Sequence, residues 1–390
     1  MSDREKLPPD PATVAAAFGV AADMAYGAVA PPLYLSSTYE FAGYDQPRLY
    51  DYGRSGNPTR DLLAEALAKL EGGAGAVITS SGMAAFDLLV SRLGPDDLIL
   101  APHDCYGGTM RLLKARESRG HCSVRFVDQT DDAAFAAGVE EVPALVLLET
   151  PSNPLMRVVD IAARATHAKE AGAAIVVDNT FLSPAIQRPI SLGADYVIHS
   201  TTKYLNGHSD VIGGAVVAAD PAEVQELRHW ANVLGSAGAP FDSWLTMRGL
   251  RTLFPRMEQQ QNNAMAVANF LENHPAVAKV HFPGLPSDPG HAIASRQQRG
   301  FGAMLSFDLQ GGIPAVRQFL KSVQFFTLAE SLGGIESLVA HPATMTHADM
   351  GEEARAVAGI SDSLLRLSIG LEAEHDLLAG LELGLTACRG

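Results

Sequence analysis

The sequence predicts an α/β protein with a mainly parallel seven-stranded sheet, preceded by an irregular N-terminal arm and followed by a smaller α+β C-terminal domain. Two observations predict this fold class. Between residues 61 and 256, short apolar runs alternate with longer helical stretches, which is typical of parallel strands joined by helices. Beyond residue 256, one long helical stretch is followed by a Pro/Gly-rich loop and an alternating run.

The composition is that of a folded acidic protein. The chain has 390 residues and a formal net charge of −15, and 47% of its residues are hydrophobic. This apolar content excludes a disordered chain, and the length favours about two domains. The acidic balance argues against nucleic acid or an anionic membrane as the main partner. No stretch approaches the ~18 apolar residues of a membrane span, so no membrane contact is expected.

The cysteines and the N-terminus predict a cytoplasmic location. Cys105, Cys122 and Cys388 are widely spaced and form neither a disulfide framework nor a zinc ribbon, which is typical of a reducing compartment. The alanine-rich stretch 14–22 is too weakly hydrophobic for a secretory signal and is predicted to be a short helix. The histidine pairs lack the partners of a zinc site, so no metal is expected.

Three regions are predicted along the chain: an arm over 1–60, a cofactor-binding domain over 61–256 and a C-terminal domain over 257–390. The arm lacks clear periodicity, and residues 50–59 are rich in turn formers. Because an irregular segment of this length seldom stays ordered alone, we expect it to pack on a neighbouring subunit.

The predicted sheet consists of seven apolar runs. They are residues 76–79, 98–101, 124–127, 145–148, 175–177, 196–199 and 215–218. Their lack of alternation predicts strands that are buried on both faces. Helices are expected at 61–70, with Gly72 and Gly73 as the stop, and also at 82–92 and 161–171. Ligands in such sheets bind beyond the carboxyl ends of the strands, so the residues that follow each run are candidates for a site.

The C-terminal region is predicted from four features. A helix is expected at 257–273, a Pro/Gly-rich loop at 282–290, an alternating strand at 304–309 and a closing helix near 376–386.

Three strand ends carry side chains that suit one cofactor. Ser80 to Met83 follow the first run and open a helix, where backbone N–H groups favour a phosphate, although a plain N-cap is the alternative. Asp178 ends another run and needs a partner, either a protonated ring nitrogen or a capped helix. Lys203 follows a third run, and a partly desolvated amine there can form a Schiff base. Pyridoxal phosphate (PLP) requires all three groups. A nicotinamide oxidoreductase is disfavoured because the glycine fingerprint is absent.

The segment around Lys203 resembles the signature of the Cys/Met-metabolism PLP enzymes, which have fold type I. The likeness extends from Tyr26 to the C-terminus. The segments that carry it are Tyr52-Gly-Arg54, Asn57-Pro-Thr59, Ser81-Gly-Met83, Tyr106-Gly-Gly108, Pro151-Ser-Asn-Pro154, Val177-Asp-Asn-Thr-Phe181, Ser200-Thr-Thr-Lys-Tyr-Leu-Asn-Gly-His-Ser209, Glu330-Ser-Leu-Gly-Gly334 and Arg366-Leu-Ser-Ile-Gly370.

The resemblance implies roles for individual residues. Lys203 is expected to hold the cofactor and move protons, Asp178 to pair with the pyridine nitrogen and Tyr106 to stack on the ring. The residues expected at the cofactor phosphate are Gly82, Met83, Ser200 and Thr202, with Tyr52 and Arg54 reaching in from a neighbouring subunit. The residues expected to bind the amino-acid substrate are Arg366, Asn153 and Ser331 at the α-carboxylate, together with Glu330 and, at the distal carboxylate, Arg111.

Within that family, the chain resembles the branch that performs γ-replacement. The implied reaction joins O-succinyl-L-homoserine and L-cysteine to give L-cystathionine and succinate. Two alternatives use the same set of residues: γ-elimination of cystathionine to cysteine, 2-oxobutanoate and ammonia, and sulfhydrylation of an acylated homoserine. The resemblance also implies a homotetramer in which subunits share active sites.

Overall fold

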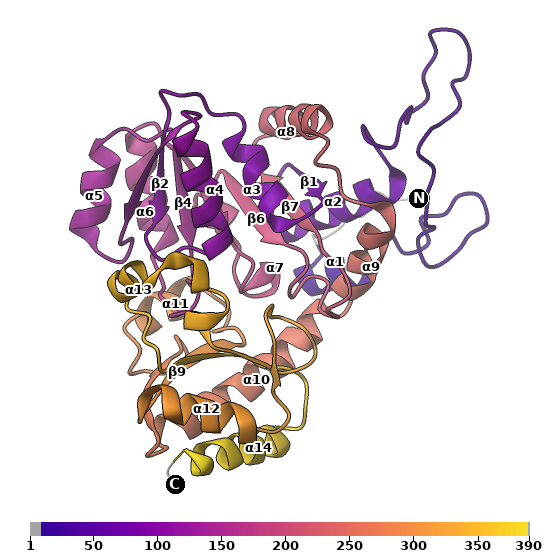
Figure 1. The fold of residues 1–390 in the computed structure, drawn as a ribbon. Helices are drawn as coiled ribbons and strands as arrows, with labels where there is room; N and C mark the ends of the chain where they lie inside the picture. The colour runs from indigo at the N-terminus through magenta and orange to yellow at the C-terminus, as the bar shows by residue number, and fades with distance from the viewer. Residues whose placement is uncertain (1–8, 389–390) are drawn as a thin grey trace.

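The computed structural model describes residues 9–388 and contains two sheets (Figure 1). The larger sheet has seven strands in the order β1-β7-β6-β5-β4-β2-β3. Their bounds are β1 Gly75–Thr79, β2 Leu98–Pro102, β3 Ser123–Val127, β4 Leu145–Glu149, β5 Ala174–Asp178, β6 Tyr196–Ser200 and β7 Gly214–Ala218. The seven predicted runs are therefore confirmed as strands, and each end lies within one residue of the prediction.

The sheet is mostly parallel, as predicted. Strands β2 to β6 pair in parallel, whereas β7 is antiparallel to both β6 and β1, so β7 alone runs against the others. All residues of β1, β4 and β7 are buried. The prediction of burial on both faces is wrong for β3, where Ser123 and Arg125 are exposed. This strand lies at one edge of the sheet, whereas β1, at the other edge, is buried because helices pack against it.

Helices cover both faces of this sheet (Figure 1). The helices of this half are α2 Pro58–Glu71, α3 Gly82–Val90, α4 Gly107–Ser118, α5 Asp132–Glu140, α6 Ile161–Glu170, α7 Ser183–Ile186, α8 Pro221–Leu234 and α9 Pro240–Leu250. Successive residues of β4 point to opposite sides: Leu147 packs with α3, α4 and α8, whereas Leu148 packs with α5 and α6.

Local sequence explains where these helices begin and end. Asn57 caps α2, because its side-chain oxygen accepts hydrogen bonds from the N–H groups of Thr59 and Arg60. The helix therefore starts at Pro58, three residues before the predicted start. It stops at Gly72, as predicted, where φ of +80° suits a residue without a side chain.

The second sheet has five strands in the order β10-β11-β12-β9-β8. Its strands are β8 Val277–His281, β9 Met304–Leu309, β10 Thr327–Leu328, β11 Leu338–Ala340 and β12 Leu364–Ser368, and its helices are α10 Leu253–Glu272, α11 His291–Gln297, α12 Gly312–Ser322, α13 Glu352–Ala358 and α14 Glu374–Ala387. The alternating run 304–309 forms β9, but five of its six residues are buried, since β9 lies between β12 and β8.

One core joins the two halves. The largest cluster of buried apolar residues includes side chains from α2, α10, β9, β12 and α14. Helix α10 starts at Leu253, four residues earlier than predicted, so the predicted domain boundary at 256/257 falls inside this helix. The division into three regions stays a prediction, and the first eight and last two residues lie outside the described part.

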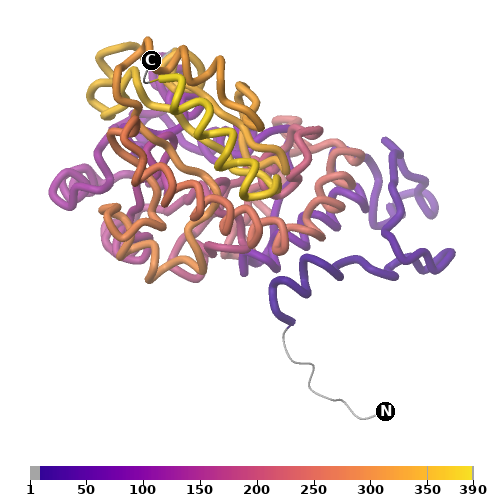
Figure 2. Tube along the Cα trace, turned by 90° about the horizontal axis from the view of Figure 1, so that it is seen from below, coloured from indigo at the N-terminus to yellow at the C-terminus, as the bar shows by residue number. Residues whose placement is uncertain are grey.

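The N-terminal segment is irregular, as the sequence indicates. Helix α1 covers Pro11–Ala17, which is shifted from the predicted helix at 14–22 because Asp10 caps it. Residues 18–57 contain isolated bridges rather than strands, and they extend from the body in indigo (Figures 1 and 2). Among residues 9–388, no helix has the length and hydropathy to cross a membrane.

Candidate active site

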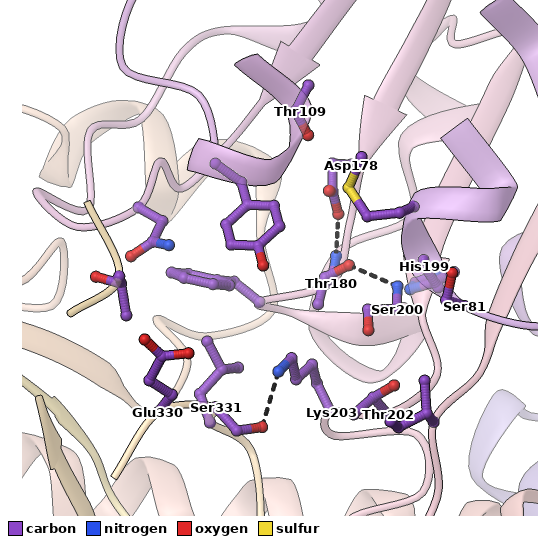
Figure 3. Close-up of a pocket in the computed structure, with 18 of the residues that line it drawn as sticks. Ser81, Thr109, Asp178, Thr180, His199, Ser200, Thr202, Lys203, Glu330 and Ser331 are labelled. Atoms are coloured by element: carbon purple, nitrogen blue, oxygen red, sulfur yellow. Dashed lines mark hydrogen bonds between the residues drawn. The ribbon is translucent and has the colours of Figure 1, made fainter. Parts of the chain in front are cut away.

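A cavity of about 960 Å³ lies where the carboxyl ends of the seven-stranded sheet face the five-stranded half (Figure 3). Strands β4, β5 and β6 contribute Glu149, Asp178 and Ser200, and β12 contributes Arg366. The predicted residues that line the cavity are Gly82, Met83, Tyr106, Arg111, Asn153, Asp178, Ser200, Thr202, Lys203, Glu330, Ser331 and Arg366. The fold thus brings together residues that are up to 284 positions apart in the sequence.

The first wall of the cavity is the start of α3. Ser81 caps this helix, and its Oγ accepts a hydrogen bond from the N–H of Ala84 (3.0 Å). The N–H groups of the first turn have no partner within the helix, which makes this end suitable for an anion. Thr202 also lines the cavity, and its Oγ1 accepts a hydrogen bond from the N–H of Gly213 (3.0 Å), next to Gly214, whose backbone lies close to Ser81.

Gly82 is required by the close approach of α3 to β6. A Cβ atom at this position would lie 2.8 Å from the Cβ of Ser200, closer than real side chains approach. We expect Gly82→Ala to weaken PLP binding about tenfold, because overpacking costs about 1–3 kcal/mol and moves the start of α3. Titration of the apoprotein with PLP measures the effect.

The control for this substitution is Gly94→Ala. At Gly94 an added Cβ would meet only the Asp97 carboxylate oxygen, at an ordinary contact distance of 3.7 Å. This variant should bind PLP like the unmodified protein. Equal PLP affinity in both variants would contradict the assigned role of the close approach.

Asp178 lies at the end of β5 and lines the cavity. Its Oδ1 accepts a hydrogen bond from the N–H of Thr180 (2.9 Å), and the Thr180 hydroxyl accepts from the N–H of Ser200 (2.9 Å), as Figure 3 shows. The next helix, α7, starts at Ser183, so the alternative role of Asp178 as its N-cap is not what the structure shows. Removal from water raises the pKa of Asp178 above its usual value, whereas the bonds from Thr180 oppose this change.

Lys203 follows β6 and points into the cavity. Its Nζ donates a hydrogen bond to Ser331 Oγ (2.7 Å) across the two halves of the protein (Figure 3). Burial, together with the charge of Arg366, lowers the pKa of Lys203 to about 8. A lysine with this pKa has a larger neutral, nucleophilic fraction near neutral pH than an ordinary lysine.

Arg366 is a buried guanidinium with a free donor. Its Nη1 donates to Asn153 Oδ1 (2.9 Å) and its Nη2 to the carbonyl of Ser331 (2.9 Å). Its Nε is buried without a protein partner. Burial lowers the pKa of Arg366 to about 10, so it stays charged at neutral pH. A cationic fork with an unused donor fits a carboxylate.

Tyr52 and Arg54 do not line this cavity. Arg54 Nε donates to Asn232 Oδ1 (2.8 Å), and the guanidinium lies 5.3 Å from the centre of the Tyr52 ring. Their expected role in a neighbouring subunit stays a prediction.

Other lining residues were not predicted from the sequence: Glu149, Thr180 and His199. Each ends or follows a predicted run, so the rule that selected Asp178 would have found them. Cys105 is fully buried, and burial raises its pKa well above the usual value, which fits a packing residue. Within the described part of the chain, no three His, Cys, Asp or Glu side chains are grouped to hold a metal.

The residues of the cavity fit PLP. An anion site at α3, a carboxylate at Asp178 and an amine at Lys203 line one space, and the buried Nε of Arg366 leaves a donor for a substrate carboxylate. Since these are the groups that PLP and an amino acid need, the sequence-based expectation of the cofactor agrees with this donor set.

The chain is similar along nearly its whole length to known proteins. Cystathionine gamma-synthase of Escherichia coli (strain K12) is 58% identical over 96% of this chain and 98% of its own. The structure of cystathionine gamma synthase from Xanthomonas oryzae pv. oryzae in complex with cystathionine gives a TM-score of 0.97 at 57% identity, covering 98% of this chain and 99% of that one. Cystathionine gamma-lyase from Lactobacillus plantarum gives a TM-score of 0.94 at 42% identity, covering 98% and 100%.

The fold is therefore the fold type I architecture of PLP enzymes, as expected. Residues 12–386 match the sequence model of the Cys/Met metabolism PLP-dependent enzymes, which is nearly the whole chain. The protein belongs to this PLP-dependent family.

Proposed function

We propose that the protein catalyses γ-replacement, in which O-succinyl-L-homoserine and L-cysteine give L-cystathionine and succinate. The observation that carries this proposal is the 58% identity, over 96% of the chain, to the Escherichia coli cystathionine gamma-synthase. The cavity supports it, because a buried cation for an amino-acid carboxylate and a lysine with a lowered pKa lie on either side of Ser331.

The lining residues would hold the cofactor and the substrate in distinct ways. The start of α3, together with Ser200 and Thr202, would bind the cofactor phosphate. Asp178 would bind the nitrogen of the cofactor ring, and the Tyr106 ring would stack on the face of that ring. PLP, when bound, supplies an electron sink that stabilises negative charge on the substrate carbons. Arg366 and Asn153 would orient the α-carboxylate. Glu330 and Arg111, which line the same cavity, would contact the rest of the substrate.

Lys203 would move the protons of the reaction. Its amine would take the proton from Cα of the homoserine moiety and one from Cβ, and later return them. The Cγ–O bond breaks as succinate leaves with the electron pair, and the cysteine thiolate forms the new Cγ–S bond. The cysteine thiol gives up its proton when it becomes the thiolate, and this proton balances the negative charge of the succinate that leaves. A positioned general base of this kind contributes about 10²–10⁴-fold.

The pKa of Lys203 predicts a pH dependence for cofactor attachment. Only the neutral amine attacks a carbonyl, and with a pKa of about 8 the neutral fraction rises about tenfold per unit below that pH. We expect the rate at which the apoprotein attaches PLP to rise between pH 6 and 8 and to level off above. Stopped-flow absorbance over pH 6–10 measures it. A rate that still rises between pH 9 and 10 would show an ordinary lysine.

One assay tests the reaction itself. The protein is incubated with L-cysteine and O-succinyl-L-homoserine, and separately with L-cystathionine alone. The proposal expects cystathionine and succinate in the first mixture at a faster rate than any breakdown in the second.

The resemblance to the Lactobacillus plantarum gamma-lyase makes γ-elimination the second candidate. Faster release of 2-oxobutanoate from cystathionine would favour that lyase, and pyruvate would indicate β-elimination. Sulfide in place of cysteine tests sulfhydrylation.

We infer that the protein forms a homo-oligomer, as a tetramer with shared active sites. The arm supports this inference, because Met24, Tyr26, Tyr44 and Leu49 are exposed apolar or aromatic side chains on an extended segment. Tyr52 and Arg54 lie on the same segment, outside the cavity of their own chain. Light scattering of the purified protein measures the mass of the oligomer.

We place the protein in the cytoplasm, which its three free cysteines support.

A further inference from the structure

Glu149 is a buried carboxylate in the wall of the active-site cavity. It ends β4, is 8% exposed and pairs in register with Asp178 on the adjacent strand. Burial and the neighbouring Asp178 raise the pKa of Glu149 well above its usual value. A carboxylate in such a place is costly unless its oxygens are satisfied by donors.

The two oxygens of Glu149 accept hydrogen bonds from two different parts of the site. Its Oε2 accepts from the backbone N–H of Tyr106 (2.8 Å), at the start of α4. Its Oε1 accepts from the backbone N–H of Asn153 (3.0 Å), in the loop that follows β4. One carboxylate therefore ties together two segments that lie 47 residues apart in the sequence.

Both of these segments carry site residues. Tyr106 lines the cavity and is the N-cap residue of α4, but its side chain makes no capping hydrogen bond. Asn153 holds the Arg366 guanidinium through Oδ1 (2.9 Å), and its carbonyl oxygen lies 3.1 Å from His347 Nε2. A shift of either backbone N–H would displace a side chain that faces the cavity.

We propose that Glu149 is a positioning residue that holds Tyr106 and the Asn153–Arg366 pair at a fixed separation, so that cofactor and substrate carboxylate bind in register. The part of this inference that concerns the substrate carboxylate rests on the proposed function. The part that concerns Tyr106 involves only the cofactor. Glu149 acts through these two residues rather than on the substrate.

The test uses Glu149→Gln, which keeps the length of the side chain. Glutamine offers one acceptor oxygen, and its NH₂ group would face the other backbone N–H, so one of the two hydrogen bonds is lost. We expect PLP affinity, measured by titrating the apoprotein, to fall about tenfold to a hundredfold, because a buried N–H group left without a partner costs about 1–3 kcal/mol. The visible circular dichroism of bound PLP should change with the position of Tyr106. The KM for O-succinyl-L-homoserine should rise more than kcat falls.

Asp308→Asn is the matched control. This carboxylate also accepts two hydrogen bonds, from His281 Nε2 (2.9 Å) and from Ser361, but it lies on β9 in the other sheet. Asp308→Asn should lower the Tm of the protein without changing the PLP affinity, the dichroism of bound PLP or the KM for O-succinyl-L-homoserine. If Glu149→Gln behaves in the same way, with all three readouts within twofold of the unmodified protein, the proposal is overturned.

A second variant separates positioning from general destabilisation. In an Asn153→Ala background, Arg366 has already lost its Asn153 partner, so Glu149→Gln should add little to KM. Independent effects that multiply would overturn the Asn153 half of the proposal. If Glu149→Gln does not fold, Glu149→Asp keeps the charge on a shorter side chain that cannot reach both donors, and the same readouts apply.

The outcomes also separate this proposal from the proposed function. PLP affinity and dichroism are measured without any substrate. A protein that makes no cystathionine but loses PLP affinity in Glu149→Gln would disprove the proposed reaction and support the role of Glu149 at Tyr106.

Discussion

Lys203→Ala is expected to abolish covalent attachment of PLP and to lower kcat by at least about 10²–10⁴-fold, the range for removal of a positioned general base. The structure gives the reason, since Lys203 Nζ points into the cavity, bonds to Ser331 and has a pKa lowered to about 8. The absorbance band of the attached cofactor, its resistance to dialysis and the rate of cystathionine formation measure the loss.

Lys279→Ala is the control for this substitution. Lys279 is an exposed lysine on β8, in the other half of the protein, so its loss should leave cofactor and activity unchanged. Full activity in Lys203→Ala would remove the basis for the proposed chemistry. Loss of activity with the covalent band retained would show that another lysine holds the cofactor.

Arg366→Lys is expected to raise the KM for O-succinyl-L-homoserine about a hundredfold, with a smaller change in kcat. Lysine keeps the charge, but it lacks the planar fork that here bonds Asn153 and Ser331 and leaves Nε for a ligand. Loss of a buried, hydrogen-bonded charge pair costs about 2–5 kcal/mol, and a hundredfold lies within that range. Steady-state kinetics with varied homoserine ester measure KM and kcat.

Arg296→Lys serves as the control for Arg366→Lys. Arg296 forms an ion pair with Asp160 (2.6 Å) outside the cavity, where a lysine can replace it at little cost. The absorbance of bound PLP should be the same in both variants. An unchanged KM in Arg366→Lys would show that the α-carboxylate binds elsewhere.

The sheet could be predicted from the sequence because its signal is local. A run such as 145–148 has no alternation and is flanked by turn formers, and strands buried on both faces require this pattern. The edge strand β3 shows where the signal ends. Its run contains Arg125, whereas the other runs contain no charged residue. An edge position alone does not expose a strand, because β1 lies at the other edge of the sheet and is fully buried.

Part of the candidate cofactor site could be predicted for the same reason. Asp178 ends a buried strand and Lys203 follows one, and parallel strands bring their carboxyl ends to one edge of the sheet. Glu149 also ends a buried strand, so the same reasoning applies to it. Lys203 lies in a segment that resembles a family signature. The contacts of Glu149 with the N–H groups of Tyr106 and Asn153 depend on the folded backbone and cannot be predicted from flanking residues.

The strands of the large sheet and the candidate cofactor lysine and carboxylate can be predicted from the sequence, because each depends on residues that are close together in the chain. The family can be predicted as well, from motifs that are spread along nearly the whole chain. Only the folded chain shows which distant groups meet. Folding brings Ser331 into hydrogen-bond contact with Lys203 and Asn153 into contact with Arg366. It also places Glu149 where it accepts hydrogen bonds from both Tyr106 and Asn153. It also lowered the pKa of Lys203, because desolvation depends on every segment packed around the amine rather than on the neighbours of Lys203 in sequence.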